Sequence, residues 1–182
     1  VVLPVHEVSG NAELAEGNID FRGDIVIHGN VESGVNIRAT GSITIDGVAE
    51  ACMLEAGKDI ILRGGMLGGN KASVKTKGAI TAKFFEFTNI LCEGDLQADV
   101  LMDCSVICHG QIRLTGRKGS IIGGKVQAIR GLIATSLGND AETRTEIFVG
   151  AGIDVYSRLR VMEKKIEMTR EELAKIEEGL EK

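Results

Sequence analysis

The chain has 182 residues, of which 24 are glycine and one is proline, Pro4. About 7% glycine, or about 13 residues, is usual for a chain of this length, so glycine is in nearly twofold excess. An excess of glycine without proline excludes collagen, and the 43% hydrophobic content excludes a disordered linker. The net charge is −5 and the chain has no block of basic residues, which makes nucleic acid an unfavourable partner.

No apolar run approaches the roughly 20 residues of a membrane span, so we expect no direct membrane crossing. Four cysteines are too few for a disulfide framework in a chain of this length. We therefore expect a reducing compartment, the cytoplasm.

Residues 1–16 precede the first clear repeat and are predicted to be an N-terminal lead-in or cap. From residue 17 to residue 156, short segments that begin with glycine and alternate in polarity recur. Examples are Gly-Asp-Ile-Val-Ile-His-Gly at 23–29 and Gly-Ser-Ile-Thr-Ile-Asp-Gly at 41–47. Successive segments begin about 16 to 21 residues apart, and the longer intervals contain extra glycines. We interpret these extra glycines as loops between coils.

Aligned on their first residue, the repeats contain four columns of apolar side chains. In the first repeat these are Ile19, Phe21, Ile25 and Ile27, and across all repeats Thr76 is the one clearly polar member. Period-two alternation indicates strands, and a repeat of this length is typical of a parallel β-helix. The predicted fold is therefore all-β, a single-stranded parallel β-helix of about eight coils over residues 17–156. One such coil is too small to fold alone and is stabilised by stacking on its neighbours.

Glycines that open the repeats are predicted to lie at the corners of the coils. A corner needs either a positive φ or a close approach of two backbones, and glycine permits both. The predicted corner glycines are Gly23, Gly41, Gly78, Gly94 and Gly110.

Residues 157–182 change to a heptad pattern, and Ser157 is a suitable N-cap. We predict a C-terminal amphipathic coiled-coil α-helix here that continues beyond the given sequence. In a parallel dimer the flanking charges would repel one another, which favours an antiparallel partner, either a second helix or a second copy. The predicted seam is Leu159, Met162, Ile166, Leu173, Ile176 and Leu180.

The candidates for chemistry are few. Residues 119–125 match the phosphate-loop pattern G-x-x-x-x-G-K, but Val126 stands where Ser or Thr should bind magnesium, so we predict a loop between coils. Cys92 and Cys108 fall in one inward column and are predicted to be buried thiols on adjacent coils rather than a disulfide. Alternation separates Cys104, Cys108 and His109 between two faces, which disfavours zinc. We predict no catalytic residue, metal or cofactor.

Residues 84–87, Phe-Phe-Glu-Phe, form the one concentration of aromatic side chains. Two interpretations are open: a corner packed into the core, or an exposed docking patch made of Phe84, Phe85 and Phe87.

Several segments resemble the flagellar assembly protein A (FapA-like) family, namely residues 17–31, 82–86, 122–125 and 137–150. The resemblance implies a right-handed parallel β-helix, related in style to bactofilins and to the C-terminal domain of the division inhibitor MinC. It also implies a role in bacterial flagellation, and the family supplies no established catalytic residues to carry over.

The leading hypothesis is a non-enzymatic scaffold in the bacterial cytoplasm, acting through protein–protein contacts of the rod and its helical arm. One alternative is a polymerising or regulatory module in the manner of bactofilins or MinC, with a second copy as partner through helix pairing or stacking of coil ends. A less favoured alternative is a β-helical acyltransferase or carbohydrate-active enzyme. The repeat of 16 is not a multiple of the six residues that such acyltransferases use, and aromatic platforms for sugars are scarce.

Overall fold

The computed structural model describes residues 4–116 and 118–150. The chain divides into two compact units, Val1–Gly150 and Ala151–Lys182. The predicted coiled-coil seam and its antiparallel pairing lie outside the described residues and stay predictions. Within the described residues, no helix has the length and apolar character needed to cross a membrane.

The described residues form short strands and one 3-10 helix, η1 (Leu14–Glu16). The strands are β1 (Val5–Val8), β2 (Ile19–Phe21), β3 (Asp24–Ile27), β4 (Asn36–Ala39), β5 (Ile43–Ile45), β6 (Ala49–Glu50), β7 (Met53–Ala56), β8 (Ile60–Leu62), β9 (Met66–Thr76), β10 (Ile80–Ala82), β11 (Phe84–Cys92), β12 (Leu96–Ala98), β13 (Val100–Cys108), β14 (Gln111–Leu114), β15 (Ser120–Ala128), β16 (Gly131–Ile133), β17 (Ser136–Leu137) and β18 (Thr145–Val149).

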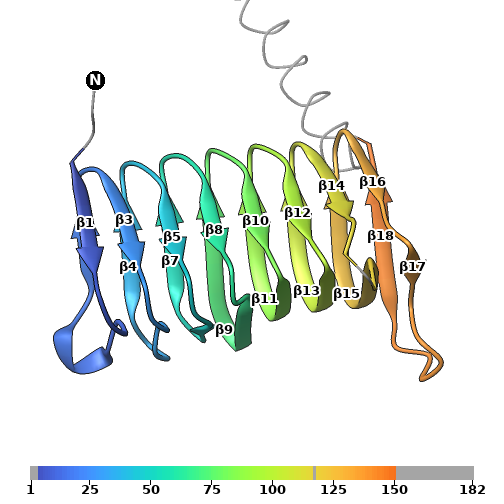
Figure 1. Cartoon of the computed structure of the whole chain (residues 1–182). Helices are drawn as coiled ribbons and strands as arrows, with labels where there is room; N and C mark the ends of the chain where they lie inside the picture. Colours follow the sequence, from blue (N-terminus) through green and yellow to red (C-terminus); the bar gives the residue numbers. More distant parts are fainter. Residues whose placement is uncertain (1–3, 117, 151–182) are drawn as a thin grey trace, which may run out of the picture. The chain divides into compact units, whose positions relative to one another are not determined.

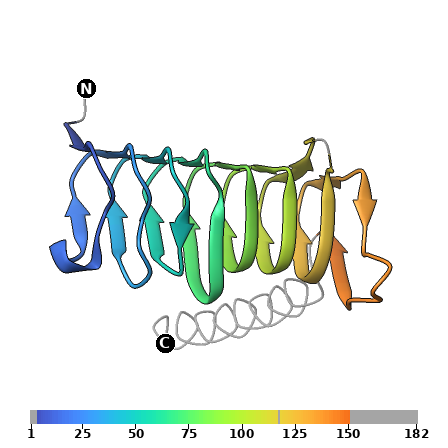
Figure 2. The ribbon, with the colours of Figure 1, turned by 60° about the horizontal axis from the view of Figure 1, so that its bottom comes forward.

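These strands build two parallel sheets that wind into a solenoid of about eight turns (Figure 1). Sheet A has the order β1-β3-β5-β8-β10-β12-β14-β16, and sheet B has the order β17-β15-β13-β11-β9-β7-β4-β2, with β18 paired to β15 and β6 paired to β9. Each turn adds one strand to sheet A and the next strand or strands to sheet B (Figure 2). The prediction of an all-β parallel solenoid of about eight turns is confirmed.

Residues of one predicted inward column pair with one another from strand to strand in these sheets. Ile25, Ile43, Ile60, Ile80 and Leu96 pair in that order along sheet A, and each is at most 1% exposed. Every coil therefore buries its aliphatic side chains against identical positions of the coils before and after it, and this burial supplies most of the stabilisation.

At the two ends of the described solenoid, inward positions are less covered. Phe21 and Ile147 are half-buried, and Val149 is 60% exposed. The N-terminal segment also joins the solenoid, because β1 pairs with β3 and Ala12 forms a bridge with Val31. Part of the predicted lead-in thus contributes a strand to sheet A.

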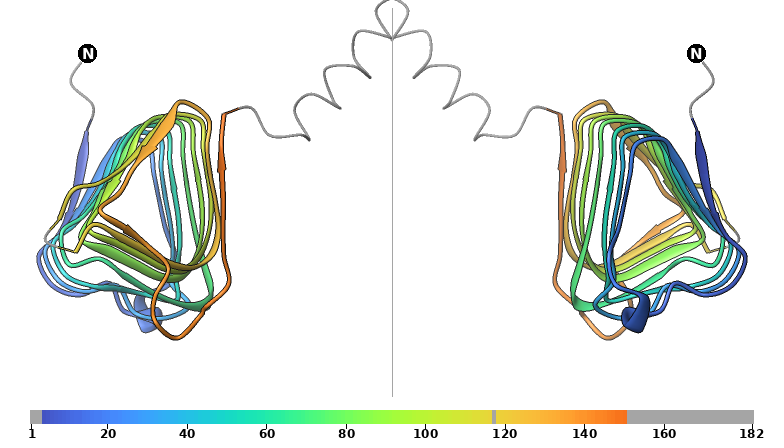
Figure 3. Two further views of the ribbon diagram at one scale, coloured as in Figure 1. Left: turned by 90° about the vertical axis from the view of Figure 1, so that its right-hand side faces the viewer. Right: turned by 90° about the vertical axis from the view of Figure 1, so that its left-hand side faces the viewer.

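Seen along its axis, the solenoid has a triangular outline with three walls (Figure 3). Sheet A is one wall, and sheet B supplies the other two because its long strands bend. We call the part of sheet B before the bend the first wall (β6, β17 and the starts of β9, β11, β13 and β15) and the part after it the second wall (β2, β4, β7, β18 and the ends of the long strands). Residues at the bend have positive φ: Ala51 (35°), Asn70 (61°), Phe87 (45°) and Asp103 (48°).

The predicted corner glycines are needed for the close approach of adjacent coil backbones more than for a positive φ. A Cβ on Gly94 would overlap the carbonyl of Gly78, and a Cβ on Gly110 would overlap the carbonyl of Gly94. Gly41 and Gly78 are likewise packed against the backbone of the preceding coil, whereas none of these four has a positive φ. Glycine at this corner lets adjacent coils stack at sheet spacing.

Carboxylates next to this corner cross-link the coils. The oxygen Oδ1 of Asp24 accepts a bond of 2.7 Å from the Ser42 N–H of the next coil. Asp59 and Asp95 repeat the contact every second coil, to the N–H of Ala79 (2.8 Å) and of Gln111 (2.9 Å). The sequence prediction missed this column of acceptors, although an acidic residue directly follows the corner position in each case.

Candidate functional site

One outward column of the second wall changes its chemistry along the solenoid. We call it the outer column; in register order its members are Asp20, Arg38, Glu55, Lys75, Leu91, Ile107, Gln127 and Phe148. Each member lies one residue beyond a buried position such as Leu54, Val74 or Ile90, so alternation in the strand turns its side chain away from the core.

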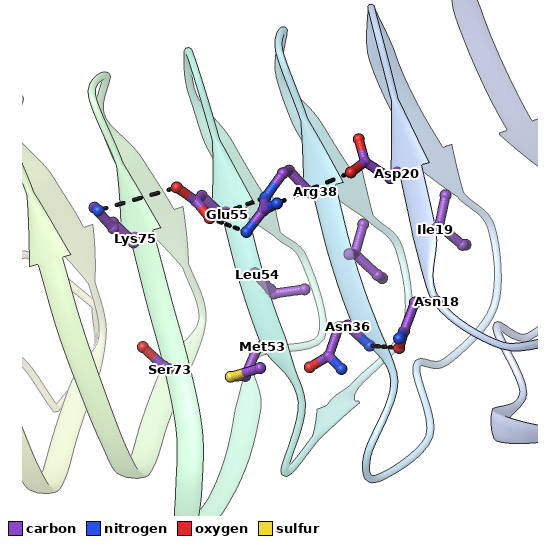
Figure 4. Close-up of a pocket in the computed structure, with 11 residues that line it drawn as sticks. Asn18, Ile19, Asp20, Asn36, Arg38, Met53, Leu54, Glu55, Ser73 and Lys75 are labelled. Carbon is purple, nitrogen blue, oxygen red and sulfur yellow. Dashed lines mark hydrogen bonds and ion pairs between the residues drawn. The ribbon is translucent and has the colours of Figure 1, made fainter.

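The charged half of the outer column (Asp20, Arg38, Glu55 and Lys75) alternates in sign from coil to coil (Figure 4). The guanidinium of Arg38 lies 3.9 Å from Asp20 and 3.0 Å from Glu55, and the ammonium of Lys75 lies 4.0 Å from Glu55. These side chains are 45 to 72% exposed, so solvent screens each pair and the row contributes little to stability.

A shallow hollow of about 410 Å³ lies beside the charged half (Figure 4). Asn36 and Met53 contribute to its lining from the neighbouring outward column, and Met53 is 50% exposed. The backbone N–H of Asn36 donates to Oδ1 of Asn18 over 2.9 Å, which fixes one end of the hollow. The hollow thus combines an exposed thioether with a row of paired charges.

The apolar half of the outer column (Leu91, Ile107 and Phe148, with Gln127 among them) occupies the same register farther along. Leu91 is 36% exposed, Ile107 is 43% exposed and Phe148 is 39% exposed. The ammonium of Lys125 lies 5.2 Å from the centre of the Phe148 ring, within cation–π distance. A second hollow, of about 420 Å³, joins the two halves, with Lys75 and Leu91 in its lining.

The aromatic segment at 84–87 is divided by the bend. Phe85 is completely buried between its register partners Met66 and Leu101. Of the two interpretations left open for this segment, Phe85 follows the corner packed into the core and takes no part in an exposed docking patch. Phe84 is half-buried on the outside of the first wall, and Phe87, also half-buried, occupies the bend with φ 45°. Strand alternation separates Phe84 from Phe85, and the bend at Phe87 interrupts the alternation that would otherwise turn Phe87 inward.

The cysteines are buried, and all four are free thiols. Cys92 and Cys108 are register partners on adjacent coils, as their shared column predicted. The pKa of Cys92 is raised mainly by a hydrogen bond with Cys108 and also by burial. Burial raises the pKa of Cys52 to about 12 and that of Cys104 to about 11. The three thiols whose pKa is raised, Cys52, Cys92 and Cys104, are poor nucleophiles at neutral pH. The hydrogen bond with Cys92 lowers the pKa of Cys108, whose side chain is buried.

Residues 119–125 do not form the predicted loop. Ser120–Ala128 is strand β15, and Gly123 and Gly124 form its bend with φ of 69° and 78°. The N–H of Gly123 donates to Oγ1 of Thr145 over 2.9 Å, so it is occupied within the fold rather than directed at a phosphate.

A second row of polar groups lies on the outside of the turn after sheet A. The imidazole of His28 contacts Glu7 (Nε2, 2.7 Å) and Asp46 (Nδ1, 2.8 Å), and Asp46 in turn pairs with Arg63 at 3.3 Å. Hydrogen bonds to Glu7 and then to Asp46 raise the pKa of His28. Among residues 4–116 and 118–150, no group of three or more His, Cys, Asp or Glu side chains is placed to hold a metal ion.

These features describe a repetitive outer surface with two chemical halves. A comparison with known families agrees with the solenoid fold beneath it. The family model described as Flagellar Assembly Protein A beta solenoid domain matches residues 4–182. The chain belongs to this family. Searches of curated proteins and of solved structures gave no match. In this FapA beta-solenoid chain, the outer column is the surface that the sequence prediction missed, and its signal is visible only when the residues after each inward position are aligned from coil to coil.

Proposed function

We propose that this chain is a non-enzymatic scaffold in flagellar assembly, working in the bacterial cytoplasm, and that it docks another protein on the apolar half of the outer column. The observation that carries the proposal is the change along a single register, from paired charges to exposed Leu91, Ile107 and Phe148. Exposed apolar side chains that align over several coils are typical of protein interaction surfaces.

The family membership supports the flagellar part of the proposal, because the matching model is described by that process. The non-enzymatic part is supported by the state of the polar groups. All four cysteines are buried, and burial raises the pKa of the Cys52 and Cys104 thiols. The surface carboxylates that contact His28 and Arg38 are engaged in ion pairs.

Docking on the charged half is less favourable, since a partner would have to desolvate Arg38 and Glu55 and compete with their pairing. Leu91 and Ile107 are adjacent in register and impose no such cost. The charged half is instead suited to align the partner at the rim, where complementary charges favour one orientation over others.

In-cell photo-cross-linking tests this proposal. A photoreactive amino acid replaces Leu91, and the matched control replaces Gln97, an exposed residue of the following strand β12 on the outside of sheet A. We expect a cross-linked protein from position 91 that mass spectrometry identifies as a flagellar component, and none from position 97.

A product at twice the mass of the chain would instead indicate self-association, the alternative in which a second copy is the partner. Equal cross-linking from both positions, or from neither, would contradict docking on the outer column.

A further inference from the structure

The two ends of the described solenoid leave both sheets with an open edge (Figure 1). Sheet A ends on β1 and on β16, while sheet B ends on β2 at one end and on β17 and β18 at the other. Each of these strands pairs in parallel with its inner neighbour. We call residues 5–21 the first coil and residues 131–149 the last coil. An open strand edge is a template for pairing with another chain.

The four most exposed large apolar side chains of the described residues lie in these two coils. Val149 and Leu137 of the last coil are 60% and 59% exposed. Val5 and Leu14 of the first coil are 56% and 55% exposed. Val149 and Leu137 occupy inward positions, because their register partners in β15 are buried. The core therefore ends in exposed apolar side chains at the last coil, and covering them would remove apolar surface from water.

The outer edge of β1 also has backbone hydrogen-bonding groups to offer. The carbonyls of Pro4 and Val8 accept hydrogen bonds from the β3 side. Because alternate residues of a parallel strand bond to opposite sides, the N–H and C=O groups of Val5 and Glu7 face away from β3. Among the described residues, no strand pairs with this edge.

Stacking the first coil of a second copy on the last coil continues the inward columns across the joint. Continuing the register places three apolar pairs there: Ile147 on Ile19, Val149 on Phe21 and Ala134 on Val8. In a fourth column Leu132 meets His6, whose ring packs against that of Phe21 with centroids 5.3 Å apart. The joint thus repeats the packing between coils within the chain.

The outward columns place no like charges opposite each other at this joint. The register pairs Phe148 with Asp20, Ile133 with Glu7, and Glu146 with Asn18. Like charges directly opposite would be destabilising, and these pairs avoid that cost. A single extended peptide could pair with one edge only, whereas the first coil of a second copy has strands of the same direction for both sheets at once.

We propose that copies of this chain stack end to end, with the last coil of one copy on the first coil of the next. These two faces are the two halves of the interface that already joins neighbouring coils within the chain. The contact joins different surfaces and does not close on itself, so it builds open stacks. The outer column then repeats along a stack, which carries one docking surface per copy. The stacking itself does not depend on that docking.

Sedimentation velocity of the full chain over a series of concentrations tests the stacking. The weight-average mass of the native chain should rise past twice the mass of one chain without a plateau. Val149→Asp places a charge in an inward column of the last coil, and Val5→Pro removes one N–H from the outer edge of β1, so each variant should be a monomer. Ile61→Asp, at an exposed position in the middle of sheet A, is the control and should stack as the native chain does. Circular dichroism verifies that each variant is folded.

Mixing Val149→Asp with Val5→Pro should give a species of twice the chain mass and nothing larger, because each variant keeps one intact end. A native chain that stays monomeric at every concentration would overturn the proposal. Native-like association of both variants would overturn it in favour of pairing through residues 157–182. Dimers of Val5→Pro alone would overturn it in favour of contacts between two last coils. No other protein is present, so this result and the result of the docking test at Leu91 are independent.

Discussion

The charged and apolar halves of the outer column share one backbone geometry and differ only in chemistry. Both lie one residue from buried aliphatic positions, Leu54 and Val74 beneath the charged half and Ile90 and Val106 beneath the apolar half. The strand segments that carry the two halves pair in parallel from coil to coil. The inward columns therefore determine the fold, whereas the outward column is free to carry an interaction surface.

The largest expected effect comes from truncating two neighbouring residues that face opposite sides of the strand. Ile90→Ala should lower the free energy of unfolding by about 2–5 kcal/mol, because Ile90 is 3% exposed and the substitution leaves a cavity. Leu91→Ala should cost less than about 1 kcal/mol, since this side chain is already partly in solvent. Urea denaturation followed by circular dichroism measures both, and similar losses would contradict the division between inward and outward columns.

Thr76 is the polar exception within an inward column and should have the next largest effect. Its hydroxyl donates to the carbonyl of Lys58 and accepts from the N–H of Gly78 at 3.1 Å. Thr76→Val removes both bonds in a buried place and should cost about 1–3 kcal/mol. Thr81→Val, at an exposed position of sheet A, is the control and should be near neutral by the same denaturation measurement.

The charged half should contribute only weakly to stability. A double-mutant cycle on Arg38→Ala and Glu55→Ala should give a coupling free energy of about 0.2–1 kcal/mol. This coupling should decrease as salt is raised from about 0.05 to about 0.5 M, because the added salt shortens the Debye length a few-fold. A coupling well above this range, insensitive to salt, would show that the row holds the coils together and is not free surface.

The smallest expected effect concerns His28 and pH. Its pKa is raised above 6.5 by Glu7 and Asp46, so the protonated form is favoured in the folded state. This contribution is fully present below the unfolded pKa and is lost as pH rises through the raised folded pKa. The native chain should therefore be more stable than His28→Gln near pH 6 and should lose that advantage by pH 9. A stability difference between the native chain and His28→Gln that grows as pH rises would contradict this prediction.

The sequence predicted the inward columns well because period-two alternation and burial have a direct physical link. It could not predict the bend of sheet B, since Ala51, Asn70, Phe87 and Asp103 adopt positive φ under the constraint of stacking and share no residue type.

The segment 119–125 was predicted as a loop because it contains three glycines. Pairing of Val100 with Ser120 and of Val106 with Val126 shows that neighbouring strands impose the sheet there.

The most direct test of the central claim extends the alternating charges over the apolar half. The double variant Leu91→Glu/Ile107→Lys continues the sequence of signs begun by Asp20, Arg38, Glu55 and Lys75. The measurement is the fraction of flagellated cells when this variant replaces the native chain at equal abundance, with its free energy of unfolding determined alongside. We expect a free energy of unfolding within about 1 kcal/mol of the native value and a loss of flagella. Normal flagellation by the folded variant would contradict docking on the apolar half of the outer column.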